Sequence, residues 1–300
     1  MTIRLDMCRA VGKAGEVLGD SLEAVRGFLR RQLSPDGSFR GRDGNSDLYY
    51  TVFGLEASLA LKVDLSPRPT HDYLAGFGAG EALDLVHLAS LIRCRANLAD
   101  SQDQQITVSM GEALMQHLLE YRASDGGFHT SRGASRGSAY GSFLALGAYQ
   151  DLQVDCAGGD ALVESVQSLQ MADGGFSNEP ALATSVTTAT AAALCLLHYL
   201  RRPVPESAVR WLLDRAHPSG GFMALPFAGG AGIPDLLSTA TALHALTLLD
   251  ACPESTREKH LDYLDSLWDP QGGFRGHWAD DAVDCEYTYY GLLSLGHLAS

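Results

Sequence analysis

Asp-Gly-Gly-Phe at residues 125–128 is the clearest copy of a short stretch that recurs along the chain. Related Gly-Gly-Phe or Gly-Ser-Phe tripeptides end at Phe39, Phe128, Phe176, Phe222 and Phe274. The first interval between these phenylalanines is about twice the others, and a degenerate copy at Phe77-Gly78 fills it. The sequence therefore predicts six repeated units.

Each unit pairs two helices of different character. The first carries apolar residues at helical spacing on one face, as at Leu114, Leu118 and Tyr121. In the turn that follows, the glycines permit positive φ and the phenylalanine returns to the core. The second helix is apolar or small on nearly every face, which requires burial on both sides. These second helices are expected at 51–61, 138–149, 187–200, 239–249 and 288–298.

Six such pairs are enough to close a ring, with the fully buried helices inside and the amphipathic ones outside. We therefore predict an all-α protein, a single α/α toroid domain that spans residues 1–300. The alternative is an open solenoid of the same pairs, which needs polar capping repeats at both ends. The last helix is apolar at 292–298, which favours the closed ring.

Composition restricts the partners and the compartment. The chain has 300 residues, of which 46% are hydrophobic, and its formal net charge of −14 argues against nucleic acids and anionic membrane surfaces as partners. The six cysteines form no Cys-x-x-Cys pair, which is typical of reduced thiols and predicts a cytoplasmic protein. Residues 1–20 contain no continuous apolar core of the signal-peptide type, and no apolar run approaches the length of about 18 residues that an integral membrane segment needs.

Polar residues recur where the inner helices begin. Parallel inner helices would gather their N-termini at one mouth of the ring, where partial positive charge and free amides suit an anion. Aligning the units places four carboxylates in one column: Asp47, Asp84, Asp235 and Asp284. Three positions later come Tyr50, His87, Ser238 and Tyr287. Each Asp is a helix cap on the simplest interpretation, yet carboxylates clustered at one cavity also raise one another's pKa and supply a general acid.

Aromatic and basic residues give candidate substrate contacts. Aromatic side chains gather near the inner-helix starts: Tyr49, Tyr50, Phe53, Tyr140, Trp278, Tyr287, Tyr289 and Tyr290. Most are expected in the core, but a tyrosine-lined cavity binds a hydrocarbon chain and stabilises a passing carbocation. Arg132 and Arg136 precede an inner helix, where a diphosphate would bind, although loop arginines are commonly solvated. Arg40, Arg42 and Arg275 are similar candidates.

Two stretches carry a resemblance to a known family. Asp-Leu-Tyr-Tyr-Thr-Val-Phe-Gly-Leu at 47–55 and Asp-Cys-Glu-Tyr-Thr-Tyr-Tyr-Gly-Leu at 284–292 accompany the Gly-Gly-Phe turns. Together they resemble the repeats of protein prenyltransferase β subunits and squalene–hopene cyclases over essentially the whole chain. The resemblance implies an α/α barrel whose central cavity accepts an isoprenoid, and it is specific for fold more than for reaction.

The resemblance also implies a zinc site that this chain does not reproduce. Prenyltransferase β subunits hold a catalytic zinc with Asp-x-Cys at one inner-helix start and His at the next. The matching positions are Asp235, Leu237 and Tyr287, and neither leucine nor tyrosine replaces a soft zinc ligand. We therefore expect no family-type metal site. The Asp-x-Asp-Asp acid motif of the cyclases is absent too.

A different metal site would form if residues from two inner-helix starts converged across the ring. Its candidate ligands are Asp84, His87, Cys285 and Glu286. Without a recognised ligand spacing, we interpret His87 as a hydrogen-bonded histidine of the core or the mouth.

The sequence thus predicts an isoprenoid-handling enzyme of the terpene cyclase or prenyltransferase type. Its expected catalytic residues are Asp284, Asp235, Asp47, Asp84, Glu286 and Tyr287. Its expected substrate contacts are Tyr50, His87, Arg132, Arg136, Tyr140, Trp278 and Tyr289. Cyclisation or isomerisation without zinc is favoured, because thiolate activation is lost.

Two alternatives stay open. One is a metal-dependent prenyltransferase with other ligands, which would need a helical partner subunit that the sequence does not indicate, and Mg²⁺ if its substrate is a diphosphate. The other is a noncatalytic toroid that binds a lipid or a protein. In each case the segment 223–234 is either a lid over the mouth or a plain connector.

Overall fold

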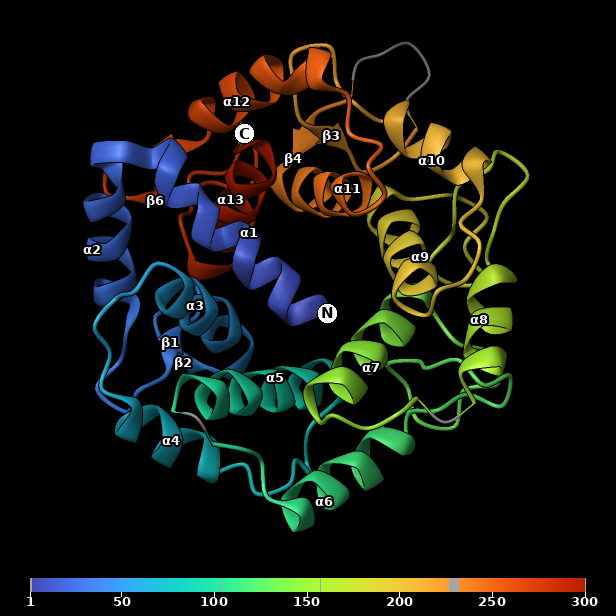
Figure 1. The fold of residues 1–300 in the computed structure, drawn as a ribbon, viewed down its shortest axis with the longest axis horizontal. Helices are drawn as coiled ribbons and strands as arrows, with labels where there is room; N and C mark the ends of the chain where they lie inside the picture. The colour runs from blue at the N-terminus through green and yellow to red at the C-terminus, as the bar shows by residue number, and fades with distance from the viewer. Residues whose placement is uncertain (1, 103, 157, 227–231, 300) are drawn as a thin grey trace.

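The computed structural model describes residues 2–102, 104–156, 158–226 and 232–299, and within them the helices alternate between two concentric rings (Figure 1). The inner ring contains α3 (Leu48–Ala60), α5 (Leu85–Ser101), α7 (Ala139–Asp151), α9 (Thr187–Tyr199), α11 (Leu236–Leu248) and α13 (Cys285–Leu298). The outer ring contains α2 (Leu22–Gln32), α4 (Pro67–Ala75), α6 (Val108–Leu119), α8 (Gly159–Gln167), α10 (Glu206–Leu213) and α12 (Arg257–Ser266). Short 3₁₀ helices, η1 (Gly19–Ser21) and η2 (Glu254–Thr256), precede α2 and α12.

The ring is closed. Each inner helix packs against the next one along the chain, and α13 returns to pack against α3 (Figure 1). The last turn also meets the first outer helix, because a Cβ added to Gly272 in that turn would lie 2.0 Å from the carbonyl oxygen of Ala24 in α2. The prediction of an α/α toroid is confirmed, and the open solenoid is excluded for the described residues.

The repeated phenylalanine ties each turn to its inner helix. All five rings are at most 2% exposed. The backbone N–H of Phe39 donates to Oγ1 of Thr51 at 2.9 Å, and this hydroxyl donates in turn to the carbonyl of Asp47 one turn earlier. The same backbone-to-hydroxyl bond recurs at the other four phenylalanines. One threonine or serine therefore satisfies a buried amide that the chain reversal would leave unpaired.

The first glycine of the turn, two residues before the phenylalanine, is required by close packing. Gly220 has φ of +93°, and a Cβ there would lie 1.9 Å from the carbonyl oxygen of Lys259 in α12. Each turn thus rests against the outer helix of the next unit, which explains why the motif repeats with the units.

Short strands were not predicted. Extended backbone pairs at three places, each only two residues long: two of the pairs lie between a Phe turn and the next inner helix, and the third flanks the last Phe turn. These pairs join β1 (Phe39–Arg40) to β2 (Ser46–Asp47), β3 (Phe222–Met223) to β4 (Pro234–Asp235), and β5 (Trp268–Asp269) to β6 (Gly273–Phe274).

Helix α1 (Ile3–Leu18) belongs to no repeat and was not anticipated. It packs on α13, α3 and α7 and crosses the end of the ring where the inner helices finish, with its first residues near the ring centre (Figure 1). Gly296 in α13 allows this contact, because a Cβ there would lie 1.7 Å from the carbonyl oxygen of Ala10. The ring therefore has a floor formed by α1 and a mouth at the inner-helix N-termini.

Two other predictions can be compared with the structure directly. No helix among the described residues is long and apolar enough to cross a bilayer. All six cysteines are free thiols, as expected from their spacing. Of the segment 223–234, residues 227–231 lie outside the described residues, so its role as lid or connector stays a prediction.

Candidate active site in the lumen

A cavity of about 460 Å³ lies inside the inner ring, within the size range of small-molecule sites. At one end it is lined by Tyr49, Tyr140 and Thr188, which belong to the first turns of three inner helices. At the other end it reaches Ile3 and Met7 of α1. The cavity thus extends along the ring axis from the mouth to the floor, and we call it the lumen.

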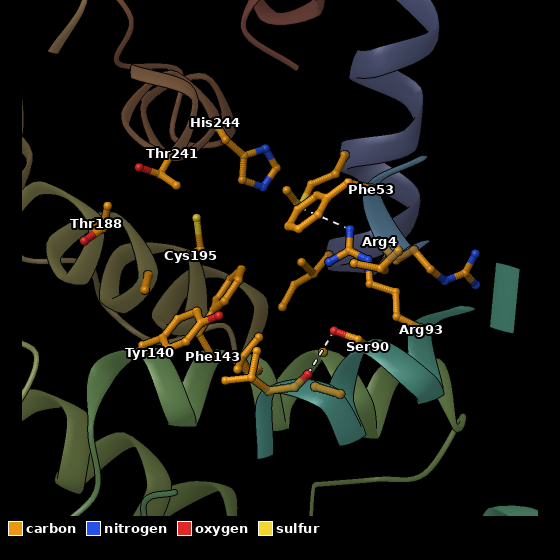
Figure 2. A pocket seen from close by; sticks show the side chains of 18 of the residues that line it. Arg4, Phe53, Ser90, Arg93, Tyr140, Phe143, Thr188, Cys195, Thr241 and His244 are labelled. Carbon is orange, nitrogen blue, oxygen red and sulfur yellow. Dashed lines mark hydrogen bonds between the residues drawn. The ribbon is translucent and has the colours of Figure 1, made fainter. Parts of the chain in front are cut away.

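The wall of the lumen is mainly hydrocarbon and aromatic. Phe53 from α3 lies 5.5 Å from the rings of both Tyr289 and Tyr290 in α13, measured between centroids. Tyr140 and Phe143 project from α7 on the opposite side, and Cys195 and Thr241 complete the wall from α9 and α11 (Figure 2). Such a surface suits an apolar ligand and presents ring faces to any positive charge that develops on it.

The carboxylates of the Asp column are helix caps. Asp47, Asp84, Asp235 and Asp284 each accept a hydrogen bond from the backbone N–H three residues later, at 2.7–2.9 Å. The donors are the residues found three positions after each aspartate in the alignment of the units: Tyr50, His87, Ser238 and Tyr287. None of the four aspartates lines the lumen. The capping interpretation is therefore seen in the structure, while a chemical role for these carboxylates stays a prediction.

The free amides expected at the mouth are largely occupied. In α7, the N–H of Ala139 donates to the carbonyl of Asn178 and that of Tyr140 to its Oδ1, while the N–H of Gly141 donates to Ser138. Loops of the next unit likewise receive the first N–H groups of α9 and α11. The expectation of a free amide rim is wrong for these bonded groups, because each unit caps its neighbour.

Asp284 belongs to a charged cluster at the mouth. Arg42 donates from Nε to Asp284 at 2.7 Å and from Nη2 to Asp280 at 2.9 Å, and its guanidinium lies 5.2 Å from the ring centroid of Tyr287. Burial raises the pKa of Asp284, although the Tyr287 N–H and Arg42 oppose that rise. Arg42 joins the first unit to the last at the point where the ring closes.

Glu286 approaches the lumen through a tyrosine. The hydroxyl of Tyr49, which lines the lumen, is 2.6 Å from Oε1 of Glu286. Burial raises the pKa of Glu286, the hydrogen bond from Tyr49 opposes that rise, and the neighbouring charge of Asp284 adds to it. Burial also raises the pKa of Tyr49 strongly. Glu286 therefore combines a hydrogen bond to a side chain that lines the lumen with a pKa raised by burial.

The remaining predicted contacts divide into lumen and exterior. Tyr140 and Tyr289 line the lumen, whereas Tyr50 and Tyr287 do not. His87 is partly exposed and its Nδ1 lies 2.9 Å from the capping Asp84, whose pKa is lowered by the bonds from His87 although burial alone would raise it.

The two arginines predicted to bind a diphosphate each lie near a protein carboxylate, and their role toward a ligand stays a prediction. Nε of Arg132 lies 3.2 Å from Glu120, and Nε of Arg136 lies 3.5 Å from Asp125 of the turn. Trp278 is 46% exposed and donates to the hydroxyl of Ser266. None of these three residues lines the lumen.

The residues at the family's zinc positions do not fit a zinc ion. Leu237 offers no donor atom and lines the lumen, and Tyr287 keeps its proton because burial raises its pKa. Asp235 is bonded to the Ser238 N–H. Among the described residues, no group of three or more His, Cys, Asp or Glu side chains lies close enough to share a metal, and the alternative set around Cys285 is not brought together.

Sequence reasoning missed a group of charged residues at the floor. These residues, which we call the floor cluster, are Arg4, Glu56, Arg93, Asn97, Asp100 and Asp151. Four of them line the lumen: Arg4, Glu56, Arg93 and Asp151. Arg93 reaches from α5 toward α1 (Figure 2). A signal was present at Glu56, the one charged residue of α3, whereas α5 carries several polar residues among which Arg93 does not stand out.

Comparison with known proteins gives one family. The family model described as Prenyltransferase alpha-alpha toroid domain matches residues 10–224 and 193–299. No curated protein matches the chain.

Solved structures with the same fold come from two kinds of enzyme. The type II terpene cyclase MstE from Scytonema is 13% identical, with a TM-score of 0.62 over 94% of this chain and 97% of that one. A variant of that cyclase, in complex with geranylgeranyl dihydroxybenzoate, is 13% identical with a TM-score of 0.62 over 97% of both chains. Protein geranylgeranyltransferase-I of Candida albicans, complexed with GGPP, is 16% identical, with a TM-score of 0.64 over 91% of this chain and 84% of that one. At these identities the likeness concerns the fold.

Proposed function

The chain belongs to the prenyltransferase alpha-alpha toroid family, and from this premise we propose that it is an enzyme that binds an isoprenoid chain in its lumen and isomerises or cyclises it by acid chemistry at the mouth. The observation that carries the proposal is the closed, aromatic lumen with the Tyr49–Glu286 pair at its mouth. The names of the enzymes that share the fold, one a terpene cyclase and one a geranylgeranyltransferase, support an isoprenoid as the ligand.

The wall of the lumen suits a carbocation intermediate. The rings of Phe53, Tyr289 and Tyr290 meet on one side, with Tyr140 and Phe143 on the other. A cation over such a ring face is stabilised by about 0.5–2 kcal/mol, more when water is excluded. Several ring faces around one cavity therefore favour a positively charged intermediate.

The proton comes from Glu286 through Tyr49. A protonated Glu286 donates to the Tyr49 oxygen while the Tyr49 hydroxyl proton passes to a terminal double bond of the substrate. Tyr49 stays neutral throughout, as its raised pKa requires, and Glu286 becomes the carboxylate. Closure of the cation onto a second double bond and loss of a proton back through the same pair give a net isomerisation.

The other mouth carboxylates take supporting roles in this scheme. Asp284 holds Arg42 beside Tyr287 and caps α13. Asp235 is the second candidate acid, because burial raises its pKa and among its described contacts no ion pair holds it ionised. A thiol-transfer reaction through zinc is not proposed, since the matching positions do not fit the metal.

The test is product formation from prenyl alcohols and linear polyenes with 15 and 20 carbons, followed by gas chromatography and mass spectrometry. We expect Glu286→Gln and Tyr49→Phe each to lower the rate by about 100-fold or more, the usual cost of losing a general acid. Tyr73→Phe in the outer helix α4 is the matched control and should retain the wild-type rate within about threefold. Rates within about threefold of wild type for both mouth variants would overturn the proton path.

A noncatalytic binding protein is the second candidate, favoured by the observation that no carboxylate of the mouth lines the lumen. In that case the wild-type protein binds the same ligands and returns them unchanged. Retention of ligand with no product from any substrate would therefore favour this candidate over the enzyme.

A further inference from the structure

The floor cluster is built as a network of paired side chains under α1. Arg4 donates from Nε to Asp151 at 2.8 Å, from Nη1 to Asn97 at 3.0 Å and from Nη2 to Asp100. Arg93 binds Glu56 through both Nε and Nη2, at 2.6 and 2.9 Å. The buried charges are therefore compensated within the cluster, as burial of charges requires.

Two polar edges of this network have no protein partner. Arg93 uses Nε and Nη2, and no hydrogen bond in the described residues uses its Nη1. Its side chain is 21% exposed, although it lines an interior cavity. Asp151 receives Arg4 at Oδ1, and no described hydrogen bond uses its Oδ2. A donor and an acceptor thus remain at the floor of an otherwise apolar cavity.

The two groups act on each other. Burial raises the pKa of Asp151 to about 6, while Arg93 and Arg4 both oppose the rise. Arg93 and Asp151 both line the lumen, and the hydrogen bonds of Arg4, Asn97 and Glu56 join them into one network. A single small polar group seated between Arg93 and Asp151 would use both edges.

The charge balance decides which group fits. The cluster contains two cations, Arg4 and Arg93, and three carboxylates, Glu56, Asp100 and Asp151. A diphosphate or carboxylate would add negative charge to a set that already lacks surplus positive charge, and burial of such an unpaired charge is unfavourable. A carbonyl or ether oxygen can accept a hydrogen bond from Arg93 but has no hydrogen to donate to Asp151. A hydroxyl can accept a hydrogen bond from Arg93 and donate one to Asp151.

We propose that the floor cluster binds the terminal hydroxyl of an amphipathic isoprenoid alcohol. Arg93 Nη1 donates a hydrogen bond to the hydroxyl oxygen, and Asp151 Oδ2 accepts a hydrogen bond from the hydroxyl. This inference rests on the proposed function, since it assumes an isoprenoid in the lumen. It adds an orientation: the oxygen end lies under α1 and the far end of the hydrocarbon chain lies at the mouth beside Tyr49. The reacting double bond is then the one most distant from the hydroxyl.

The first experiment needs no variant. Binding of farnesol, farnesyl methyl ether and a farnesene hydrocarbon to the wild-type protein is measured by competition with a fluorescent polyene. Because a hydrogen bond to a charged group discriminates by about tenfold or more, farnesol should bind about tenfold more tightly than the ether and the hydrocarbon. Equal affinities for the three ligands would overturn the floor site and leave the proposed function intact. Binding of none of them would contradict both.

Variants then locate the preference. The double substitution Glu56→Gln and Arg93→Met removes both members of one ion pair, so neither charge is left alone, and the introduced amide oxygen can still accept from Asn97. We expect the preference for farnesol to fall below about twofold, with hydrocarbon binding within about threefold of wild type. Arg95→Met is the matched control on α5, because Arg95 donates to the carbonyls of Leu74 and Gly78 and does not line the lumen. A preference that survives in the double variant would contradict the assignment.

Orientation gives a readout that a merely structural cluster would not provide. A farnesol analogue with a diazirine beside its hydroxyl carbon is photolysed in the wild-type protein, and the labelled peptide is identified by mass spectrometry. We expect the label on Ile3 or Met7 of α1, which line the floor. A label on Tyr140 or Asn178 would place the hydroxyl at the mouth and overturn the proposal.

Discussion

The mouth and the floor of the lumen both carry charged residues, but the two sets differ in origin. The carboxylates of the mouth occupy the same position in several units, and there they cap the inner helices. The charges of the floor come from α1 and from the later turns of three inner helices, where they recur at no fixed position of the repeat, and they pair side chain to side chain. The repeated residues therefore account for the ring of helices. The residues that depart from the repeat, such as those of the floor cluster, give this toroid its own polar contacts in the lumen.

The largest expected effect concerns the floor. Arg4→Met should lower the free energy of unfolding by about 3–5 kcal/mol, because it leaves the buried Asp151 carboxylate without its direct partner. Urea unfolding followed by circular dichroism measures the change. Arg9→Met on the same helix is the matched control: Arg9 is 63% exposed in its side chain and lies 3.8 Å from Asp6, so a change below about 1 kcal/mol is expected.

The mouth supplies the contrast to this prediction. Asp84→Ala removes a cap from α5 and should cost about 1 kcal/mol, the usual value for a helix N-cap. If Asp84→Ala proved as costly as Arg4→Met, the distinction between capping carboxylates and a buried network would be wrong.

A pH dependence should separate the two regions further. The folded pKa of Asp151 is about 6, above the unfolded value near 4, so the folded state binds the proton more tightly. Its contribution to stability is therefore fully present below about pH 4 and is lost as the pH rises through about 6. The loss amounts to roughly 3 kcal/mol, because each unit corresponds to about 1.4 kcal/mol.

Comparison with Asp151→Asn measures this contribution. The stability of the wild type relative to Asp151→Asn should fall between pH 4 and pH 6, because the variant lacks the titrating group. A difference that stays constant or increases over that interval would show that the ion pair with Arg4 outweighs the cost of burial.

Much of the scaffold could be predicted from the sequence because it depends on local, repeated chemistry. Gly-Gly-Phe turns and helices apolar on all faces give six pairs without knowledge of any distant contact. The capping role of the Asp column follows from its place before each inner helix. Even the lumen residues Tyr140 and Tyr289 could be named from their positions near helix starts.

What could not be predicted depends on contacts between distant residues. Helix α1 has no counterpart in the repeat, and its place across the ring follows from packing on α13 through Gly296. The pairing of Arg4 with Asp151 follows from that packing. The neighbours of Arg42 lie more than two hundred residues away in the chain and meet it where the ring closes. Periodicity gives no information on such contacts.

The central claim, that the lumen is an open site for an isoprenoid, is tested most directly by filling it. A Cβ at Gly147, which lines the lumen, or at Gly111 in the outer helix α6 would meet no atom within 4 Å, so both helical glycines can accept a large side chain. Native mass spectrometry with farnesol should show a one-to-one complex for the wild type and Gly111→Phe and none for Gly147→Phe. A complex of undiminished affinity in Gly147→Phe would place the ligand elsewhere and contradict the account.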